Sequence, residues 1–137
     1  MFEMTVNPGF SDTDALGHIN NTRLPVWFEN ARDPIFRIFT PEVDLENWPL
    51  ILAHLSIDFT GQIYFGEEVR ITTEVEKIGN SSVALRQCAW QREQCVAAST
   101  AVMVHFSYHD NCSQRIPDVI RHQLQRHLIH PPEQQSN

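Results

Sequence analysis

The hydrophobic positions along the chain divide it into one short strand, one long helix and a later series of strands. Phe2, Met4 and Val6 alternate with polar residues and predict a strand that ends at the NPG sequence of residues 7–9. From residue 22 to residue 39 the apolar side chains recur at helical spacing: Leu24, Trp27, Phe28, Ala31, Ile35, Phe36 and Phe39. An apolar face this broad is typical of a helix that other parts of the protein cover on most sides.

Polar residues and prolines mark the limits of this helix. Asn21 or Thr22 is the expected N-cap, and Pro25 is compatible with a helix because it falls in the first turn, where its missing N–H is not needed. Pro34 comes later in the segment. We therefore expect Pro34 to kink or end the helix and to leave a short second helical piece.

After residue 49 the period of the pattern changes to two, which predicts strands. The apolar face of the first of these strands holds Ile51, Ala53, Leu55, Ile57 and Phe59, and the TGQ sequence interrupts it. A second strand is expected over residues 69–76. Two more, over residues 83–90 and 95–108, are expected to form a hairpin that turns near Gln91 and Arg92.

The last predicted strand is apolar on both faces. One face holds Val96, Ala98, Val102, Val104 and Phe106. The opposite face holds Cys95, Ala97, Ser99, Ala101 and Met103. This second face lacks the charges that normally protect a solvated surface, so we interpret it as an outer face that another subunit covers.

The order of these elements predicts the fold class. A strand, a long apolar helix and four antiparallel strands joined by turns are followed by a terminal helix over residues 116–129 and a flexible tail over residues 130–137. Because one sheet must cover one very apolar helix, we expect a single domain over residues 1–137, of the α+β class, in which an antiparallel sheet wraps around a central helix. This arrangement suggests the hotdog architecture.

Composition and charge exclude several classes of function. The formal net charge of −7 argues against a nucleic-acid-binding protein, which needs a basic face. No apolar run approaches the roughly 18 residues that cross a bilayer, and the N-terminus lacks a secretory signal, so we expect a cytoplasmic protein without a membrane partner. Cys88, Cys95 and Cys112 show no CxxC spacing, so we expect neither a structural zinc site nor a disulfide.

The candidate chemistry is concentrated in the sequence SDTDALGHINN, residues 11–21, directly before the helix. This motif, together with WFENAR at residues 27–32, resembles the hotdog acyl-CoA thioesterases of the 4-hydroxybenzoyl-CoA thioesterase type. The resemblance covers most of residues 5–120 and continues through the sequence LSIDFTGQIYFGEEVRITTEVEKIGNSS, which is similar to the second and third strands of that family. It implies an acyl-CoA substrate and no cofactor.

The resemblance also implies roles for individual residues. Asp14 matches the catalytic carboxylate of the family, and Asn21 matches the residue whose backbone N–H binds the oxyanion. We assign Gly17, His18 and Asn20 to substrate binding. His18 could instead act as a base or fill a polar gap, and asparagine at the position of Asn20 caps helices whatever the function.

This assignment is chemically reasonable without the family name. A carboxylate with an ordinary pKa of about 4 is ionised at pH 7 and can attack a thioester or activate water. The start of a helix offers unpaired N–H groups where the oxyanion charge develops, and one such donor contributes roughly 10²–10³ in rate. The sequence leaves open whether Asp14 is the nucleophile or a general base.

Several alternatives compete with this interpretation. Asp12 is expected to be structural, and a metal site made of Asp12, Asp14 and His18 lacks further evident ligands. A phosphatase needs a larger α/β domain. A hotdog hydratase or dehydratase usually carries a D-x-N-P-x-H pattern, in which Leu16 and Gly17 here replace the N-P pair. A non-catalytic acyl-thioester-binding protein remains a rival from another class.

We finally expect an oligomer of even order, a homodimer or a homotetramer, and the resemblance implies that each active site lies between two subunits. One sheet around one helix leaves an edge strand unpaired, and two-fold pairing of such edges closes the assembly. The neighbouring subunit could then supply cations such as Arg70 or Arg86 for the phosphates of coenzyme A.

Overall fold

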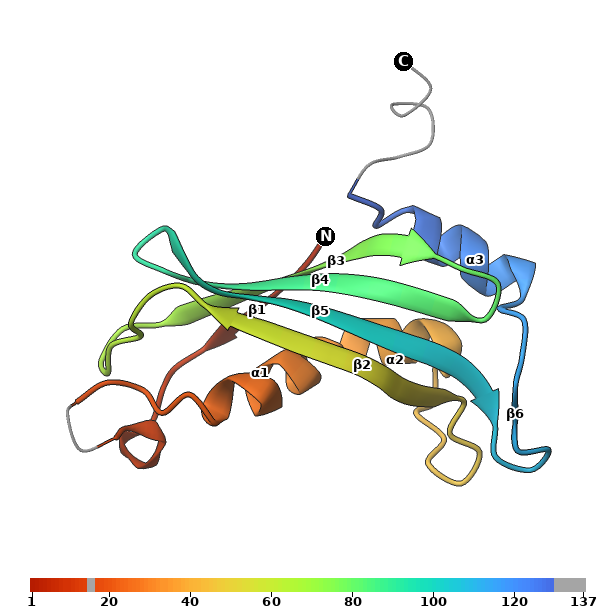
Figure 1. The fold of residues 1–137 in the computed structure, drawn as a ribbon, viewed down its shortest axis with the longest axis horizontal. Coiled ribbons are helices and arrows are strands. Elements are labelled where there is room, and N and C mark those ends of the chain that lie inside the picture. The colour runs from red at the N-terminus through yellow and green to blue at the C-terminus, as the bar shows by residue number, and fades with distance from the viewer. Residues whose placement is uncertain (15–16, 130–137) are drawn as a thin grey trace, which may run out of the picture.

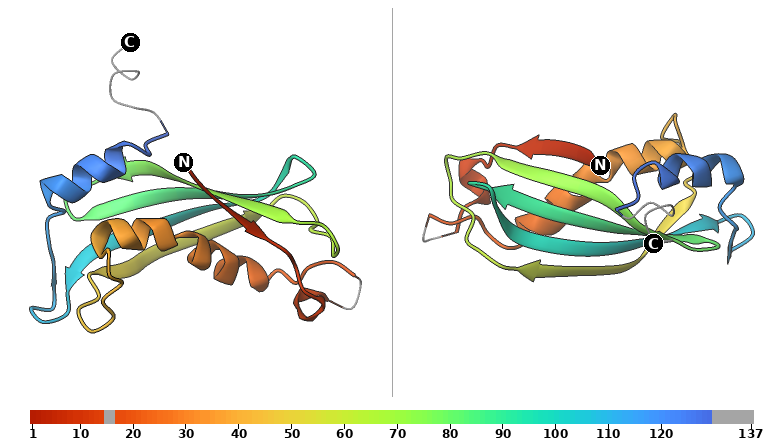
Figure 2. Two further views of the ribbon diagram at one scale, coloured as in Figure 1. Left: turned by 180° about the vertical axis from the view of Figure 1, so that it is seen from behind. Right: turned by 90° about the horizontal axis from the view of Figure 1, so that it is seen from above.

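The computed structural model, which describes residues 1–14 and 17–129, consists of a curled antiparallel sheet with two helices against its concave face (Figures 1 and 2). Ala15, Leu16 and the predicted tail of residues 130–137 lie outside the described residues. The elements are β1 Phe2–Val6, the 3-10 helix η1 Phe10–Asp12, α1 Arg23–Ala31, α2 Asp33–Phe39, β2 Leu50–Phe59, β3 Val69–Ile78, β4 Ser82–Gln91, β5 Gln94–Ser107, β6 Cys112–Ser113 and α3 Asp118–Gln125. This is the predicted α+β arrangement.

The strands lie in the order β1-β3-β4-β5-β2, and the two-residue strand β6 pairs with β5. Strands β3, β4 and β5 form the expected succession of hairpins, and the last hairpin turns at Arg92 and Glu93, both with positive φ. The expectation of short turns between all four strands was wrong for β2. This strand lies at the opposite edge, beside β5, and residues 60–68 carry the chain across the end of the sheet to β3. Hydrophobic alternation identifies strands but not their partners.

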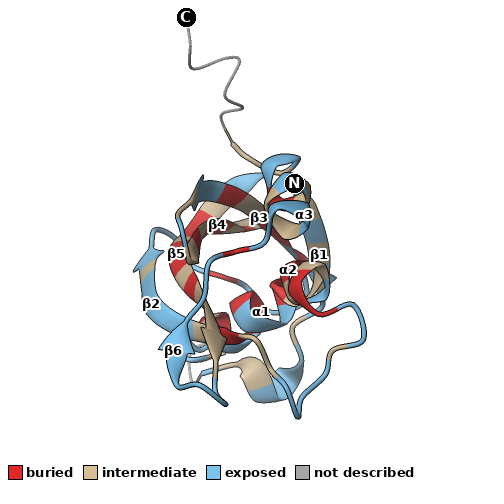
Figure 3. Ribbon diagram, turned by 90° about the vertical axis from the view of Figure 1, so that its right-hand side faces the viewer, coloured by how far each residue is buried: buried red, intermediate tan, exposed pale blue. Residues whose placement is uncertain are grey.

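The apolar face of α1 and α2 fills the hollow of the sheet, as the buried residues in Figure 3 show. Leu24, Trp27 and Phe28 are buried on α1, and Ile35 is buried on α2. The helix breaks at Arg32, where the carbonyl oxygen accepts hydrogen bonds from the N–H groups of Ile35 and Phe36. The predicted interruption before Pro34 is therefore confirmed.

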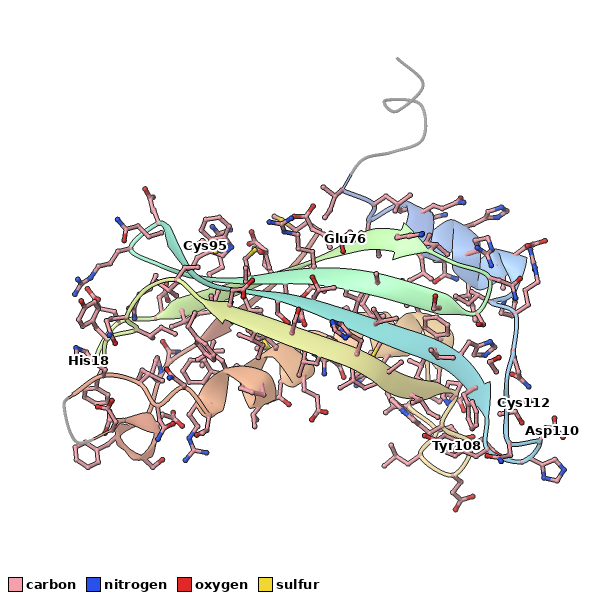
Figure 4. The ribbon with its side chains drawn as sticks, viewed as in Figure 1. His18, Glu76, Cys95, Tyr108, Asp110 and Cys112 are labelled. Carbon is pink, nitrogen blue, oxygen red and sulfur yellow. The ribbon has the colours of Figure 1, made fainter. Side chains whose placement is uncertain are left out.

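The face of β5 that we expected on the outside of the sheet faces the helices instead. The buried residues of β5 are Val96, Ala97, Ser99, Ala101 and Met103, and Val96, which we expected on the other face, joins the core at the irregular pairing beside Ala97. Cys95 instead turns to the convex side, because the β4–β5 pairing is irregular between Ala89 and Trp90 (Figure 4). The assignment was wrong because both faces are apolar. Small side chains are needed on the inner face, where the bulky residues of α1 approach the sheet.

A bulge in β2 changes which of its side chains share a face. The pairing with β5 shifts between Leu52 and His54, so Leu50 and Leu52 join the face of Leu55 and Phe59, while the predicted member Ile51 leaves it. Because β2 is an edge strand and the helices do not cover it fully, Leu52, Leu55 and Phe59 are 41%, 36% and 49% exposed. The concave face of the sheet thus ends in an uncovered apolar strip.

The terminal helix α3 packs beside the end of β3 and also contacts α2 (Figure 2). The N–H of Val75 donates to the carbonyl oxygen of His127, and the N–H of Ile129 donates to that of Val75, both at 2.9 Å. Leu124 and Ile116 are completely buried in this part of the core. The helix therefore closes one end of the sheet and leaves the opposite end, near residues 12–21, open.

We expect Phe28→Ala to lower the free energy of unfolding by about 3–5 kcal/mol, because Phe28 is completely buried and its removal leaves a cavity. Val26→Ala on the same helix is the matched control, since Val26 is 51% exposed and its loss should cost less than about 0.5 kcal/mol. Urea denaturation at one fixed protein concentration measures both. Equal losses would contradict the orientation of α1.

Candidate active site

The sequence from Asp12 to Asn20 folds back on itself as a short antiparallel ladder. The N–H of Asn20 donates to the carbonyl oxygen of Asp12 at 2.8 Å, Thr13 bridges to Ile19, and the N–H of Asp14 donates to the carbonyl oxygen of His18 at 2.7 Å. Successive rungs of a ladder are about 3.4 Å apart, so Asp14 lies about 7 Å beyond the rung that leads into α1.

Asp14 and His18 face each other at the neck of this loop. The carboxylate oxygen Oδ1 of Asp14 accepts a hydrogen bond from the His18 N–H at 3.2 Å, and the Asp14 residue is exposed. Gly17 has a φ of +81°, a conformation that residues with side chains rarely adopt. Nothing lies within 4 Å of the place where a Cβ would stand on Gly17, so it is the backbone conformation that favours glycine here.

The loop is held against the segment that connects β2 to β3. The N–H of Ile19 donates to the Ile63 carbonyl oxygen at 2.9 Å, and His18 bridges to Tyr64, whose ring lies 5.4 Å from the His18 ring. The buried side chain of Gln91 fixes Tyr64 in turn, because it accepts from the Tyr64 N–H at 2.8 Å and donates to the Tyr64 carbonyl oxygen at 2.9 Å. Tyr64 and Gln91 were not predicted, since no local pattern marks them.

Asn20 organises the start of α1. Its Oδ1 atom accepts hydrogen bonds from both the N–H and the hydroxyl of Thr22, each at 2.9 Å. The carbonyl oxygen of Asn21 accepts from the Leu24 N–H at 3.2 Å, whereas the Asn21 N–H makes no hydrogen bond to the described residues. Thr22 is the N-cap residue of α1, as one of the two expected positions, and the Asn20 side chain binds Thr22 rather than a helical N–H. The oxyanion role of the Asn21 N–H stays a prediction.

Asp12 has the structural role expected of it. Its Oδ2 atom accepts from the Gly9 N–H at 2.8 Å, and its Oδ1 atom lies 3.1 Å from Nε of Arg23. These contacts tie the 3-10 helix η1 to the first turn of α1. The two aspartates of the motif therefore differ in their surroundings. The Asp12 carboxylate is bound within the turn before α1, whereas Asp14 is an exposed residue of the loop.

Aromatic side chains and the guanidinium of Arg92 also lie around the loop. Phe10 and Phe65 are exposed and their rings are 6.2 Å apart, while the guanidinium of Arg92 lies 4.4 Å from the centre of the Tyr64 ring. Arg92 also forms an ion pair with Glu67 at 2.7 Å. The sequence offered no signal for this cluster, because its members come from three separate segments.

The two arginines that the sequence suggested for binding phosphates lie elsewhere. Arg70 forms a 2.7 Å ion pair with Glu3 and lies over the ring of Trp90. Arg86 stands on the convex face of the sheet beside Ser56 and Asp58. The present structure, a single chain, does not bring either arginine next to the loop of Asp14.

The described residues contain no cluster of three or more His, Cys, Asp or Glu side chains that could hold a metal ion. Cys88, Cys95 and Cys112 are all free thiols, and burial raises the pKa of the Cys88 thiol. Figure 4 places Cys95 on the convex side and Cys112 at the end of the molecule opposite His18. No described helix is both long enough and apolar enough to cross a membrane.

Comparison with solved structures supports the fold and its class of chemistry. A predicted thioesterase from Bacillus stearothermophilus is 36% identical, with a TM-score of 0.90, over 93% of this chain and 96% of that chain. A thioesterase from Thermus thermophilus, complexed with coenzyme A and Zn, is 25% identical, with a TM-score of 0.80, over 90% of this chain and 96% of that chain. The predicted hotdog fold is thus confirmed.

Sequence comparison gives the family. The uncharacterized protein YsmA of Bacillus subtilis is 30% identical over 80 residues, which are 58% of this chain, and the chain spans about half (54%) of the length of that curated relative. The model of the thioesterase-like superfamily matches residues 8–124, most of the sequence. The chain therefore belongs to the thioesterase-like superfamily.

Proposed function

We propose that this protein hydrolyses an acyl-CoA or a related acyl thioester to the free acid and the thiol. The observation that carries the proposal is the placement of the Asp14 carboxylate and the Asn21 N–H at the two ends of one short ladder at the start of α1. The complex of the similar Thermus thermophilus thioesterase with coenzyme A supports the CoA thioester as substrate. The resemblance to the 4-hydroxybenzoyl-CoA thioesterase type supports the individual roles.

In this proposal the Asn21 N–H binds the carbonyl oxygen of the thioester as it becomes an oxyanion. Asp14 either attacks the carbonyl carbon, giving an anhydride that water then hydrolyses, or removes a proton from the water that attacks. In both routes the C–S bond breaks, the thiolate leaves with its electron pair, and the oxygen of water enters the acid. A thiolate leaves readily, so no strong general acid is required.

His18, Gly17 and Asn20 have supporting roles in the proposal. The backbone N–H of His18 orients the Asp14 carboxylate, and the His18 ring packs against Tyr64, so the His18 side chain forms one wall of the substrate site. The positive φ of Gly17 turns the loop without a side chain that would obstruct the thioester. Asn20 contributes by fixing the helix start.

We also propose that the active protein is a homodimer or homotetramer. The uncovered apolar side chains of β2 support this, because an edge strand with such residues is a strong candidate for pairing with a second copy. The inner face of β5 no longer contributes to the argument, since α1 and α2 cover it. Pairing of two β2 edges would extend the sheet and would let the second subunit bring cations to the site.

Asp14→Asn should lower kcat for an acyl-CoA at least a hundredfold, a loss of about 3 kcal/mol of transition-state stabilisation, because the amide is neither a nucleophile nor a base. Asp12→Asn is the matched control two residues away and should lose much less activity, since Asp12 is bound to Gly9 and Arg23. Thiol release measures both rates. Near wild-type activity in Asp14→Asn, or equal losses in the two variants, would refute the assignment of Asp14.

Hydrolysis should survive dialysis against EDTA and alkylation of the thiols, because the proposed mechanism uses only a carboxylate and a backbone N–H. The activity of treated and untreated enzyme is compared on the same acyl-CoA. A loss of activity that zinc or manganese restores would favour a metal-dependent mechanism instead.

Light scattering after size-exclusion chromatography should give at least twice the 15.8 kDa mass of one chain. Leu55→Glu should dissociate the assembly, because Leu55 is on the exposed apolar edge and a charge there cannot be buried without a partner. Glu76→Gln, an exposed substitution on β3, is the control. A fully active monomer would contradict the proposal of shared active sites.

A further inference from the structure

Arg32 is an unusual residue of this core because it is charged and only 2% exposed. It lies at the break between α1 and α2, where its Nη1 atom donates to the Oε1 atom of the buried Gln87 at 3.2 Å. The side chain of Gln87 also donates to the carbonyl oxygen of Phe28 at 2.9 Å and to the hydroxyl of Thr73 at 3.1 Å. The guanidinium of Arg32 is therefore held by the side-chain amide of Gln87, whose oxygen and nitrogen atoms both form hydrogen bonds.

The charge of Arg32 is not balanced by a contact within the described chain. None of the ion pairs of the described residues includes it, and its Nε atom is buried without a hydrogen-bond partner. Nη2 likewise makes no hydrogen bond to the described residues. Burial lowers the pKa of Arg32, although the charge of Glu29 opposes this effect. A buried cation is stabilised by an acceptor that carries negative charge, so this guanidinium favours an anionic ligand.

Arg32 lines a groove of about 380 Å³ between the helices and the inner face of β2. The apolar lining of the groove comes from Phe36 on α2, from Trp48, and from Leu50, Leu52 and Met103 on the sheet. Glu29 and Asp33 also line the groove from the helices. The groove therefore combines an apolar wall for a hydrocarbon with a single cation, Arg32, among its lining residues.

The two unpartnered donors of Arg32 lie on the same edge of the guanidinium. Nε–H and one N–H of Nη2 point in parallel, and this fork matches the two oxygens of a carboxylate. The hydroxyl of Ser99, which pairs with Gln87 in the strand register, is also buried without a partner. A carboxylate would accept hydrogen bonds from both donors of the Arg32 fork.

We propose that Arg32 binds a carboxylate at the far end of the acyl group, so that the preferred substrates are thioesters of ω-carboxylated, medium-length chains. This inference rests on the proposed hydrolysis at Asp14. Arg32 follows Asn21 by eleven residues, which is about 16 Å along a helix, and its side chain leans back towards the helix start. An extended chain of roughly 8–12 carbons spans this interval.

The acidic side chains of the groove lead to a second prediction, whose effect on binding of a carboxylated chain is opposite to that of Arg32. Asp33 is neutralised by Arg37 at 2.7 Å. Glu29 forms no ion pair with the described residues and lines the groove one helical turn before Arg32. Its charge repels an anion at that point, so removal of this charge should strengthen binding of a carboxylated chain while removal of Arg32 should weaken it.

The test compares kcat/KM for the mono-CoA thioester of decanedioic acid with that for decanoyl-CoA, two substrates of equal length. The wild-type ratio should exceed ten in favour of the carboxylated chain. Arg32→Met should lower this ratio at least tenfold, Arg32→Lys should lower it less because it keeps the charge but loses the fork, and Glu29→Gln should raise it. Arg126→Met removes an exposed cation after α3 and should leave the ratio unchanged.

A binding measurement on the wild-type protein separates this inference from the proposed hydrolysis and does not depend on a variant that folds. Free decanedioate should raise the Tm more than decanoate at equal concentration. Decanedioate stabilisation without any turnover would refute the hydrolysis and keep the assignment of Arg32. Equal Tm shifts, or a kcat/KM ratio near one for the two thioesters, would overturn the assignment of Arg32. An Arg32→Met variant that changes only the oligomeric state would also overturn it, because a neighbouring subunit would then supply the carboxylate.

Discussion

The structure depends on the burial of one apolar helix by one sheet. Trp27, Phe28 and Ile35 cannot be covered by a flat sheet, so the strands curl around α1 and α2 and place small residues such as Ala97 and Ala101 where the helix approaches. Because the curl is finite, it covers the helices on one side and leaves the edge strand β2 with uncovered apolar side chains. The same geometry leaves the first turn of α1 at the open end of the sheet, directly after the Asp14 loop.

The candidate site follows from how this exposed helix start is secured. Asp12 holds the preceding turn through Gly9 and Arg23, and the Asn20 side chain binds Thr22, the N-cap residue of α1. Gln91, the last residue of β4, forms hydrogen bonds with the backbone N–H and carbonyl oxygen of Tyr64 and so supports the loop through Tyr64. These contacts fix the backbone of Asp14 and His18 with respect to the helix, and a fixed arrangement of carboxylate and donor is what hydrolysis of a thioester requires.

The sequence predicted the elements whose signals are local. The helix and its interruption before Pro34, the five longer strands, and a hairpin near Gln91 and Arg92 were identified, because period and turn chemistry act over a few residues. The two-residue strand β6 was not predicted. The inner face of β5 was assigned wrongly since both of its faces are apolar. The face of Ile51 was assigned wrongly since a bulge at Leu52–His54 shifts the alternation by one residue.

Features that depend on distant partners could not be predicted. The place of β2 beside β5, the clamp formed by Gln91, and the burial of Arg32 against Gln87 join residues between 27 and 55 positions apart. For the site, the sequence named the loop residues but not Tyr64 or the aromatic cluster of Phe10 and Phe65, which come from other segments. The assignment of Asp14 and Asn21 stays a prediction, supported by the contacts that the loop makes.

The central claim is that the loop and the helix start form a hydrolytic site and not only a binding site. The direct measurement is release of free CoA, detected with a thiol reagent, from a panel of short, long, aromatic and carboxylated acyl-CoA thioesters at catalytic concentrations of the wild-type protein. The account predicts many turnovers per chain for at least one class of acyl group. Saturable binding of acyl-CoA without release of CoA across the whole panel would contradict it and would identify a non-catalytic acyl-thioester-binding protein.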